Sequence, residues 1–170
     1  MAFDGAYLCK IKQEIQEMAG GRIDKISQPA RDTLVIVLRA AGGNRRLLIS
    51  AAAAGAKVHF TASAIENPKA APMFCMLLRK HLGSGKLLRV EQAGLDRVLS
   101  LVFECVNELG DRVELTLLCE IMGRHSNIIL LDQNRKIIDA IKRVDFVTSE
   151  ARQVLPGMTY TPPPQQHKLC

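Results

Sequence analysis

The spacing of apolar residues predicts an amphipathic helix near the N-terminus, and proline and glycine positions predict a second helix further along the chain. Over residues 4–19, apolar side chains recur every three or four positions, and Lys and Glu fill the other faces. This is the period of an α-helix with one buried face, and Gly20-Gly21 is a typical helix stop. Pro72 at the first turn, with Gly83 and Gly85 at the end, predicts a second helix over residues 73–82.

Short apolar runs bounded by Gly, Pro and Asn predict strands between and after these helices. The first group has the form of an antiparallel meander, and the second contains two hairpins. Helix, sheet, helix and sheet in succession predict an α+β fold, in which two antiparallel sheets pack face to face with the helices at the flank. The predicted strands are residues 22–28, 33–40, 45–50, 57–61, 86–93, 98–107, 112–120, 128–131 and 136–141.

The periodicity fades beyond Val147, and the chain end is rich in proline and polar residues. Such composition is typical of a linker, and 170 residues suit one well-cored domain. We therefore predict a single domain over residues 1–150 and an extended tail over residues 151–170.

The composition suits a polyanionic partner without proving one. Lys and Arg number 23 against 17 Asp and Glu, which gives a net charge of +6. The chain has two Tyr, five Phe and no Trp. This low aromatic content argues against RNA recognition that depends mainly on stacking bases on exposed rings.

Cysteine and histidine usage points to a reduced compartment and to no metal. The five cysteines lie mostly in apolar runs, where a free thiol is a small buried hydrophobe, and no pair has CxxC spacing. The four His residues are scattered, so we predict no metal site. The N-terminus lacks a signal peptide's basic and apolar regions, and no apolar run is long enough to span a bilayer. We expect a cytoplasmic protein.

One polar segment between two apolar strands is a candidate RNA-contact loop. Gly123 permits close backbone approach, and Arg124 offers a planar fork that suits phosphate. His125, Ser126 and Asn127 add donors and acceptors for phosphate, a base edge or a ribose hydroxyl. The segment comprises Glu120, Ile121, Met122, Gly123, Arg124, His125, Ser126 and Asn127.

An alternative interpretation needs no ligand. Ser126 and Asn127 can satisfy turn backbone groups with their side chains, while Arg124 is solvated and His125 packs in the core. The residues alone do not decide between these two interpretations.

Asp96-Arg97 is a second candidate, placed just before the apolar run at Val98. In extended chain the two side chains point to opposite faces, so each needs its own partner. Arg97 can meet a phosphate, and Asp96 can accept from a base amine. The alternative is a surface turn that Asp96 caps.

Other basic groups are weaker candidates. Arg79 and Lys80 close the second predicted helix, where cations favour the helix dipole in any case, so an RNA contact there is an additional possibility. Arg45-Arg46 and Lys142-Arg143 are short charge pairs, usually solvated, that could extend a phosphate track.

Known catalytic motifs are lacking. GxSxG, a phosphate-binding P-loop, GxGxxG before a helix and HExxH do not occur in the sequence. We therefore predict no catalytic residues, no cofactor and no enzymatic activity.

Several segments together resemble the NFACT family, also known as the RqcH or fibronectin-binding protein A family, of ribosome-associated quality-control factors. The similarity runs in order along almost the whole chain. The segments are residues 1–5, 20–26, 72–82, 95–97, 107–111, 120–127 and 137–144.

The resemblance implies an N-terminal domain of a longer protein that also has a helix-hairpin-helix region, a coiled coil and a second NFACT domain. It implies binding to an obstructed large ribosomal subunit with peptidyl-tRNA, and recruitment of tRNA, in bacteria alanyl-tRNA, for C-terminal tailing. It assigns tRNA binding to Asp96, Arg97 and residues 120–127. Peptidyl transfer belongs to the ribosome in this scheme.

Two alternatives come from the same resemblance. The older family name implies an adhesin that binds an extracellular matrix protein, fibronectin or fibrinogen. The family fold is similar to that of formamidopyrimidine-type DNA glycosylases, which implies a remote glycosylase-like DNA-binding role. Those enzymes open on a nucleophilic Pro followed by Glu, where this chain has Ala2-Phe3, so we expect no glycosylase activity.

Overall fold

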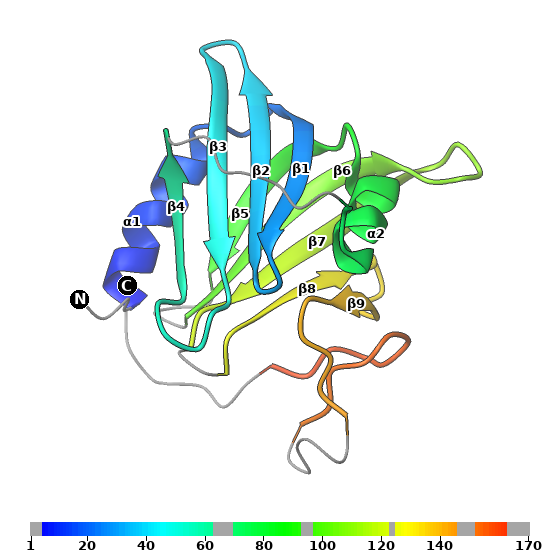
Figure 1. The fold of residues 1–170 in the computed structure, drawn as a ribbon. Coiled ribbons are helices and arrows are strands. Elements are labelled where there is room, and N and C mark those ends of the chain that lie inside the picture. The colour runs from blue at the N-terminus through cyan, green and yellow to red at the C-terminus, as the bar shows by residue number, and fades with distance from the viewer. Residues whose placement is uncertain (1–4, 63–69, 93–96, 123–124, 146–151, 163–170) are drawn as a thin grey trace.

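The computed structural model describes residues 5–62, 70–92, 97–122, 125–145 and 152–162. These residues form two helices and nine strands (Figure 1), close to the elements that the sequence predicts. The helices are α1 (Gly5–Gln16) and α2 (Met73–Leu82). The strands are β1 (Arg22–Ala30), β2 (Thr33–Ala40), β3 (Gly43–Ser50), β4 (Lys57–Thr61), β5 (Lys86–Gln92), β6 (Val98–Val106), β7 (Arg112–Glu120), β8 (Asn127–Leu131) and β9 (Ile137–Ala140).

The predicted bounds of α2 are confirmed, whereas α1 is shorter than predicted. The helix ends at Gln16 rather than at residue 19. The next residues form tighter turns, in which the amides of Met18 and Ala19 donate to the carbonyls of Ile15 and Gln16. Turns of this i to i+3 type commonly close an α-helix.

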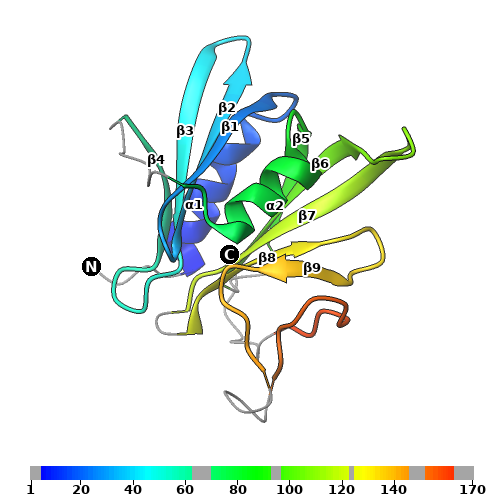
Figure 2. The ribbon, with the colours of Figure 1, turned by 45° about the vertical axis from the view of Figure 1, so that its right-hand side comes forward.

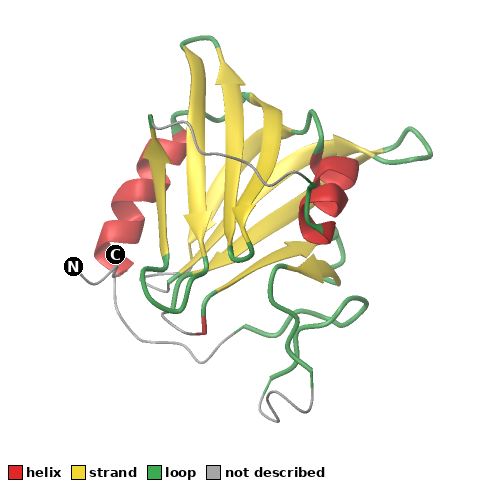
Figure 3. Cartoon of the chain, in the orientation of Figure 1, coloured by secondary structure: helices red, strands yellow, loops and turns green. Residues whose placement is uncertain are grey.

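All nine strands belong to one antiparallel sheet, in the order β4-β3-β2-β1-β5-β6-β7-β8-β9. The prediction of two separate sheets is wrong in this respect. Strands β1–β4, which we call the first half, nevertheless lie across β5–β9, the second half, as Figures 1 and 2 show. The sheet thus bends over a core and packs on itself. The secondary structure is mostly strand, with the helices at either side (Figure 3).

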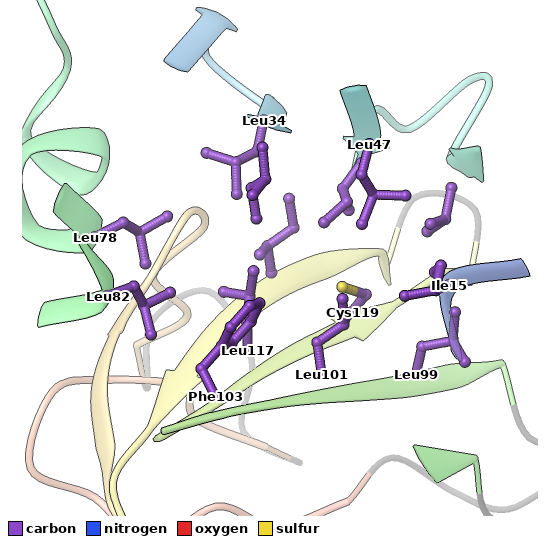
Figure 4. Close-up of a cluster of buried hydrophobic side chains, with 14 of the residues drawn as sticks. Ile15, Leu34, Leu47, Leu78, Leu82, Leu99, Leu101, Phe103, Leu117 and Cys119 are labelled. Carbon is purple, nitrogen blue, oxygen red and sulfur yellow. The ribbon is translucent and has the colours of Figure 1, made fainter. Parts of the chain in front are cut away.

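The core fills the space between the two halves. Each helix contacts strands of both halves, α1 through β4 and β5, and α2 through β1, β6 and β9. The apolar faces that the sequence pattern predicts therefore close the open sides of the bent sheet. Fully buried residues from both halves and from both helices meet in Figure 4, among them Ile15, Leu34, Leu47, Leu78, Leu82, Leu101, Phe103 and Leu117.

A short seam between β1 and β5 joins the two halves. Arg22 pairs with Lys86, and the amide of Gly20 donates to the Leu87 carbonyl at 2.7 Å. Gly21 lies in this seam, where an added Cβ would stand 2.9 Å from the Met18 carbonyl oxygen and 3.0 Å from that of Arg39. Nonlocal hydrogen bonding, which the apolar pattern does not encode, unites the predicted sheets.

Residues 152–162 differ from the extended linker that we predicted. Val154 pairs with Val144, and Thr159 pairs with Lys136 at the β9 edge. A second, smaller apolar cluster holds this segment to the sheet, and its residues are Leu118, Ile129, Leu131, Ile137, Ala140, Val154 and Tyr160. The apolar residues that anchor this segment are few and widely spaced. They form no periodic pattern from which its packing could be predicted.

The expectation of buried, free cysteines is confirmed for three of them. Cys75, Cys105 and Cys119 are free and buried, and burial, with a smaller contribution from the charge of Glu104, raises the pKa of Cys105 to about 11. Cys9, in contrast, is disulfide-bonded, which departs from the expectation of reduced thiols throughout. Among the described residues, no cluster of His, Cys, Asp and Glu could hold a metal ion. Neither described helix has the length and apolar composition that crossing a membrane requires.

We predict that Gly21→Ala destabilises the fold by about 1–3 kcal/mol, because its Cβ meets backbone atoms that cannot rotate away. Gly42→Ala is the matched control, since its Cβ meets nothing within 4 Å, and it should change stability by less than about 0.5 kcal/mol. Urea denaturation of both variants measures the difference. Equal stabilities would show that the seam has more room than its geometry indicates.

Candidate nucleic-acid interface

The pairing of β6 with β7 brings the two polar segments of the sequence together. Val98, at the start of β6, pairs with Glu120, at the end of β7. One residue further, the amide of Ile121 donates to the Arg97 carbonyl at 2.8 Å. The backbone that precedes β6 therefore lies against the first residues of the predicted loop. Two segments that are far apart in the sequence form one corner of the sheet.

The side chains of Ser126 and Asn127 hydrogen-bond to backbone groups of the loop and of the neighbouring chain. Both side chains are buried, and Ser126 Oγ accepts from the Met122 amide at 2.7 Å. Asn127 Oδ1 accepts from the amides of Lys142 at 3.0 Å and Ile128 at 2.9 Å, while Nδ2 donates to the Lys142 carbonyl at 2.8 Å. These are bonds to backbone, as in our alternative interpretation. They fix the loop against the chain that follows β9.

Glu120 is completely buried at the base of the loop, with 0% of its side chain exposed. Arg152 Nη1 donates to its Oε1 at 3.0 Å, and Arg152 Nη2 donates to Oε2. The Tyr160 hydroxyl also donates to Oε2, at 2.6 Å. The carboxylate is thus engaged by two side chains of the 152–162 segment, which explains how a buried charge is tolerated here.

The ionisation of this cluster follows from its burial. Burial opposes the charge of Arg152, but its hydrogen bond and attraction to Glu120 raise its pKa above the ordinary value. Burial, then the charge of Glu120, also raises the pKa of Tyr160. Arg152 therefore stays charged and the phenol stays protonated, so both can donate to the carboxylate. We call these three residues the Glu120 cluster.

Among the described residues of the corner, three side chains reach the surface, and one of them, Arg97, carries a fixed positive charge. Arg97 and Met122 are half-buried, and His125 is exposed, so the alternative that His125 packs in the core is wrong. We call these three residues the Arg97 corner. Ile121 is buried and donates its amide to Arg97. Three of the predicted contact residues, Asp96, Gly123 and Arg124, lie outside the described residues.

Arg79 and Lys80 do not join this corner. Arg79 Nε donates to the Ile26 carbonyl at 2.9 Å, which ties α2 to β1. Lys80 Nζ lies 3.3 Å from Glu108, with both side chains exposed. Glu108 belongs to the turn at the opposite end of the β6–β7 hairpin, roughly 25 Å from the corner for strands of this length.

Sequence reasoning missed Arg152 and Tyr160, which lie in the predicted linker. Neither has a local signal, because their partner is more than thirty residues away. The one available hint is Glu120 itself. A carboxylate at the end of an apolar strand requires a cationic or hydrogen-bonding partner if it is buried.

The bent sheet with its helices and this polar corner is an α+β domain of a known type. Residues 4–170 match the family described as NFACT N-terminal and middle domains, and the chain belongs to this family. The match covers the whole described structure, including the 152–162 segment.

Individual relatives agree with this assignment. The protein named Rqc2 homolog RqcH from Bacillus subtilis is 46% identical over 171 residues, which cover 99% of this chain and 30% of that protein. Ribosome quality control complex subunit 2 of Schizosaccharomyces pombe is 35% identical over 96 residues, 55% of this chain and 9% of that protein. The chain spans less than a third of the length of these relatives.

Solved structures share the fold closely. The N-terminal domain of fibronectin-binding protein PavA from Streptococcus pneumoniae has a TM-score of 0.92 and 39% sequence identity, covering 96% of this chain and 63% of that one. The mostly antiparallel sheet with two helices therefore matches the architecture of this solved N-terminal domain.

We predict that Glu120→Gln lowers the free energy of unfolding by about 3 kcal/mol, because it leaves the charge of Arg152 without its partner in a buried site. Glu114→Gln is the matched control on the same strand. Its carboxylate pairs with Arg89 at 3.0 Å, but both side chains are about half exposed, so the change should be below about 1 kcal/mol. Chemical denaturation of the two variants measures both changes in the free energy of unfolding. Similar losses would refute a structural role for the Glu120 cluster.

Proposed function

We propose that this chain is the tRNA-contacting module of a ribosome-associated quality-control factor. Membership in the NFACT family supports this proposal, as does similarity to relatives named for ribosome quality control. The single observation that carries it is the juxtaposition of Arg97 with the loop after β7.

The construction of the corner supports recognition rather than catalysis. The Glu120 cluster, Ser126 and Asn127 engage backbone and buried groups, so they hold the first and last residues of the loop in place. Arg97, Met122 and His125 remain at the surface. An Arg fork can bind a phosphate, and a His can donate to phosphate or a ribose hydroxyl. A contact surface held by buried bonds loses little entropy when it binds.

In this proposal the partners are tRNA, alanyl-tRNA by family resemblance, and a large ribosomal subunit that carries peptidyl-tRNA. The ribosome performs peptidyl transfer, so the chain needs no catalytic group and no cofactor. The protein then works in the cytoplasm and promotes C-terminal alanine tailing of stalled chains. Direct contact with RNA is proposed for Arg97, His125 and, outside the described residues, Asp96, Gly123 and Arg124. The backbone of residues 120–122 and the side chains of Ser126 and Asn127 position them.

We predict that Arg97→Ala weakens tRNA binding about tenfold, because it removes a phosphate-capable fork. The fold should persist, since the Arg97 carbonyl still accepts from Ile121. Arg112→Ala is the matched control, an exposed Arg at the other end of the same hairpin. Fluorescence anisotropy with labelled tRNA measures both.

The control should bind like the wild-type protein. If the two variants lose affinity equally, general charge accounts for the binding and the Arg97 corner does not. If neither variant changes it, the tRNA-binding proposal fails at this site.

A second candidate function is binding of fibronectin or fibrinogen. The observation that favours it is the fold shared with a structure described as a fibronectin-binding protein. Surface plasmon resonance with immobilised fibronectin at physiological salt tests it. Saturable binding to fibronectin, together with absent binding to tRNA, would reverse the order of the two candidates.

A further inference from the structure

We propose that the tRNA-binding surface continues from the Arg97 corner onto the turns of the first half, where Arg31 and Lys57 contact phosphates of the same tRNA. This extension rests on the proposed function, since it takes tRNA as the ligand of the corner. It adds contacts from strands β1–β4, which lie in the other half of the sheet.

The turns of the first half lie at the same end of the molecule as the corner. In Figures 1 and 2, the β1–β2 turn, the β3–β4 loop and the end of β7 all lie at the lower end of the strands. The end of β7 pairs with the start of β6, which Arg97 precedes. A ligand that contacts the corner therefore faces these turns as well.

Hydrogen bonds join the turns to the corner without a gap. The Ala51 amide donates to the Asp32 carbonyl at 2.8 Å, which ties the β3–β4 loop to the β1–β2 turn. Lys142 Nζ donates to the Ala51 carbonyl, and the backbone of Lys142 is bonded to the Asn127 side chain at 2.8 and 3.0 Å. Asn127 pairs with Glu120, at the end of β7.

Lys142 is the link between the two halves in this series. Its side chain is half-buried, and its ammonium donates to a backbone carbonyl of the first half. Hydrogen bonds from a charged donor are stronger than neutral ones. The ammonium of Lys142 is therefore used inside the fold and does not belong to an exposed phosphate track. We assign Lys142 as a positioning residue that holds the turns beside the corner.

Two exposed cations stand on these turns. Arg31 lies in the β1–β2 turn and Lys57 opens β4, and both side chains are exposed. Lys57 pairs with Ser50, and Ser50 with Thr33. Two strand spacings, about 10 Å, therefore separate Lys57 from the strand that follows Arg31. Neither cation has an ion-pair partner within the described part of the chain.

The charge and the span of this end of the molecule favour a nucleic acid. Among the described residues of the linked segments, and apart from groups already paired inside the fold, Arg31, Lys57 and Arg97 stand against one carboxylate, Asp32. Three strand spacings, about 14 Å, separate Arg97 from the chain at Lys142, and the other two cations lie beyond it. A small anion reaches only one of these cations, whereas a nucleic acid presents phosphates over the whole span.

Fluorescence anisotropy of the whole chain with labelled tRNA tests the extension. Arg31→Gln/Lys57→Gln should weaken tRNA binding about tenfold, and it should reduce the slope of log affinity against log salt by about 1.6, since each lost phosphate contact removes roughly 0.7–0.9. The matched control Arg112→Gln/Lys136→Gln removes one Arg and one Lys from exposed positions beside the β6–β7 and β8–β9 turns. The control should keep the wild-type affinity and slope.

Lys142→Met tests the positioning role. It keeps an apolar stem but removes the ammonium, so tRNA binding should weaken about threefold as the turns lose their fixed place. The salt slope should stay at the wild-type value, because no phosphate contact is lost. Lys142→Arg, which can still donate to the Ala51 carbonyl, should restore the affinity. A slope reduced by about 0.8 in Lys142→Met would place the ammonium on a phosphate and overturn the positioning role.

The remaining outcomes separate the extension from the proposed function. If Arg31→Gln/Lys57→Gln binds tRNA like its control while Arg97→Ala weakens binding, the extension falls and the proposed function stands. If Arg97→Ala and the double variant both leave tRNA binding unchanged, the proposed function fails at this site and the extension fails with it. The same measurement with purified large ribosomal subunits tests the source of the RNA. A loss of affinity for the subunit alone would assign Arg31 and Lys57 to ribosomal RNA and overturn the extension.

Discussion

The register of β6 against β7 is the constraint on which both the core and the candidate site depend. Leu99 pairs with Cys119, Leu101 with Leu117 and Phe103 with Leu115, and all six side chains enter the core. A slip of one residue in either strand would turn the apolar set of that strand outward. It would also separate Arg97 from Ile121. The pairing that buries the core is therefore the pairing that assembles the polar corner.

The Glu120 cluster connects this register to a segment that is distant in the sequence. A fully buried carboxylate stabilises a fold only when its partners are in place, and here both partners come from residues 152–162. The segment thus completes the domain at the side where the candidate loop begins. Packing and recognition use different atoms of one short motif, since Glu120, Ser126 and Asn127 face inward while His125 faces outward.

Local patterns in the sequence predicted most of the elements, because the period of apolar residues reports which face of a helix or strand is buried. The bounds of α2 and the β6–β7 hairpin are examples. The join between β1 and β5 was not predictable in this way, since it consists of backbone bonds around Gly20 and Gly21. The partners of Glu120 were missed for a related reason. A single distant Arg and Tyr leave no periodic signal.

The residues of the candidate site were chosen by residue type and family resemblance, and the structure separates their roles. Burial and hydrogen bonding distinguish Asn127, which supports the backbone, from Arg97 and His125, which remain available to a ligand. Sequence alone could not make that distinction, because Ser, Asn and Glu suit both a polar contact and an internal bond.

Site-specific photocrosslinking tests the central claim most directly, because it reports which surface of the protein lies against bound tRNA. A photoreactive amino acid would replace exposed His125 in one sample and exposed Leu109, in the turn at the far end of the β6–β7 hairpin, in another. Crosslinks to tRNA from position 125, with few from position 109, are the predicted result. Crosslinks from position 109 alone, or equally from both positions, would contradict a tRNA-binding corner built on Arg97 and the loop after β7.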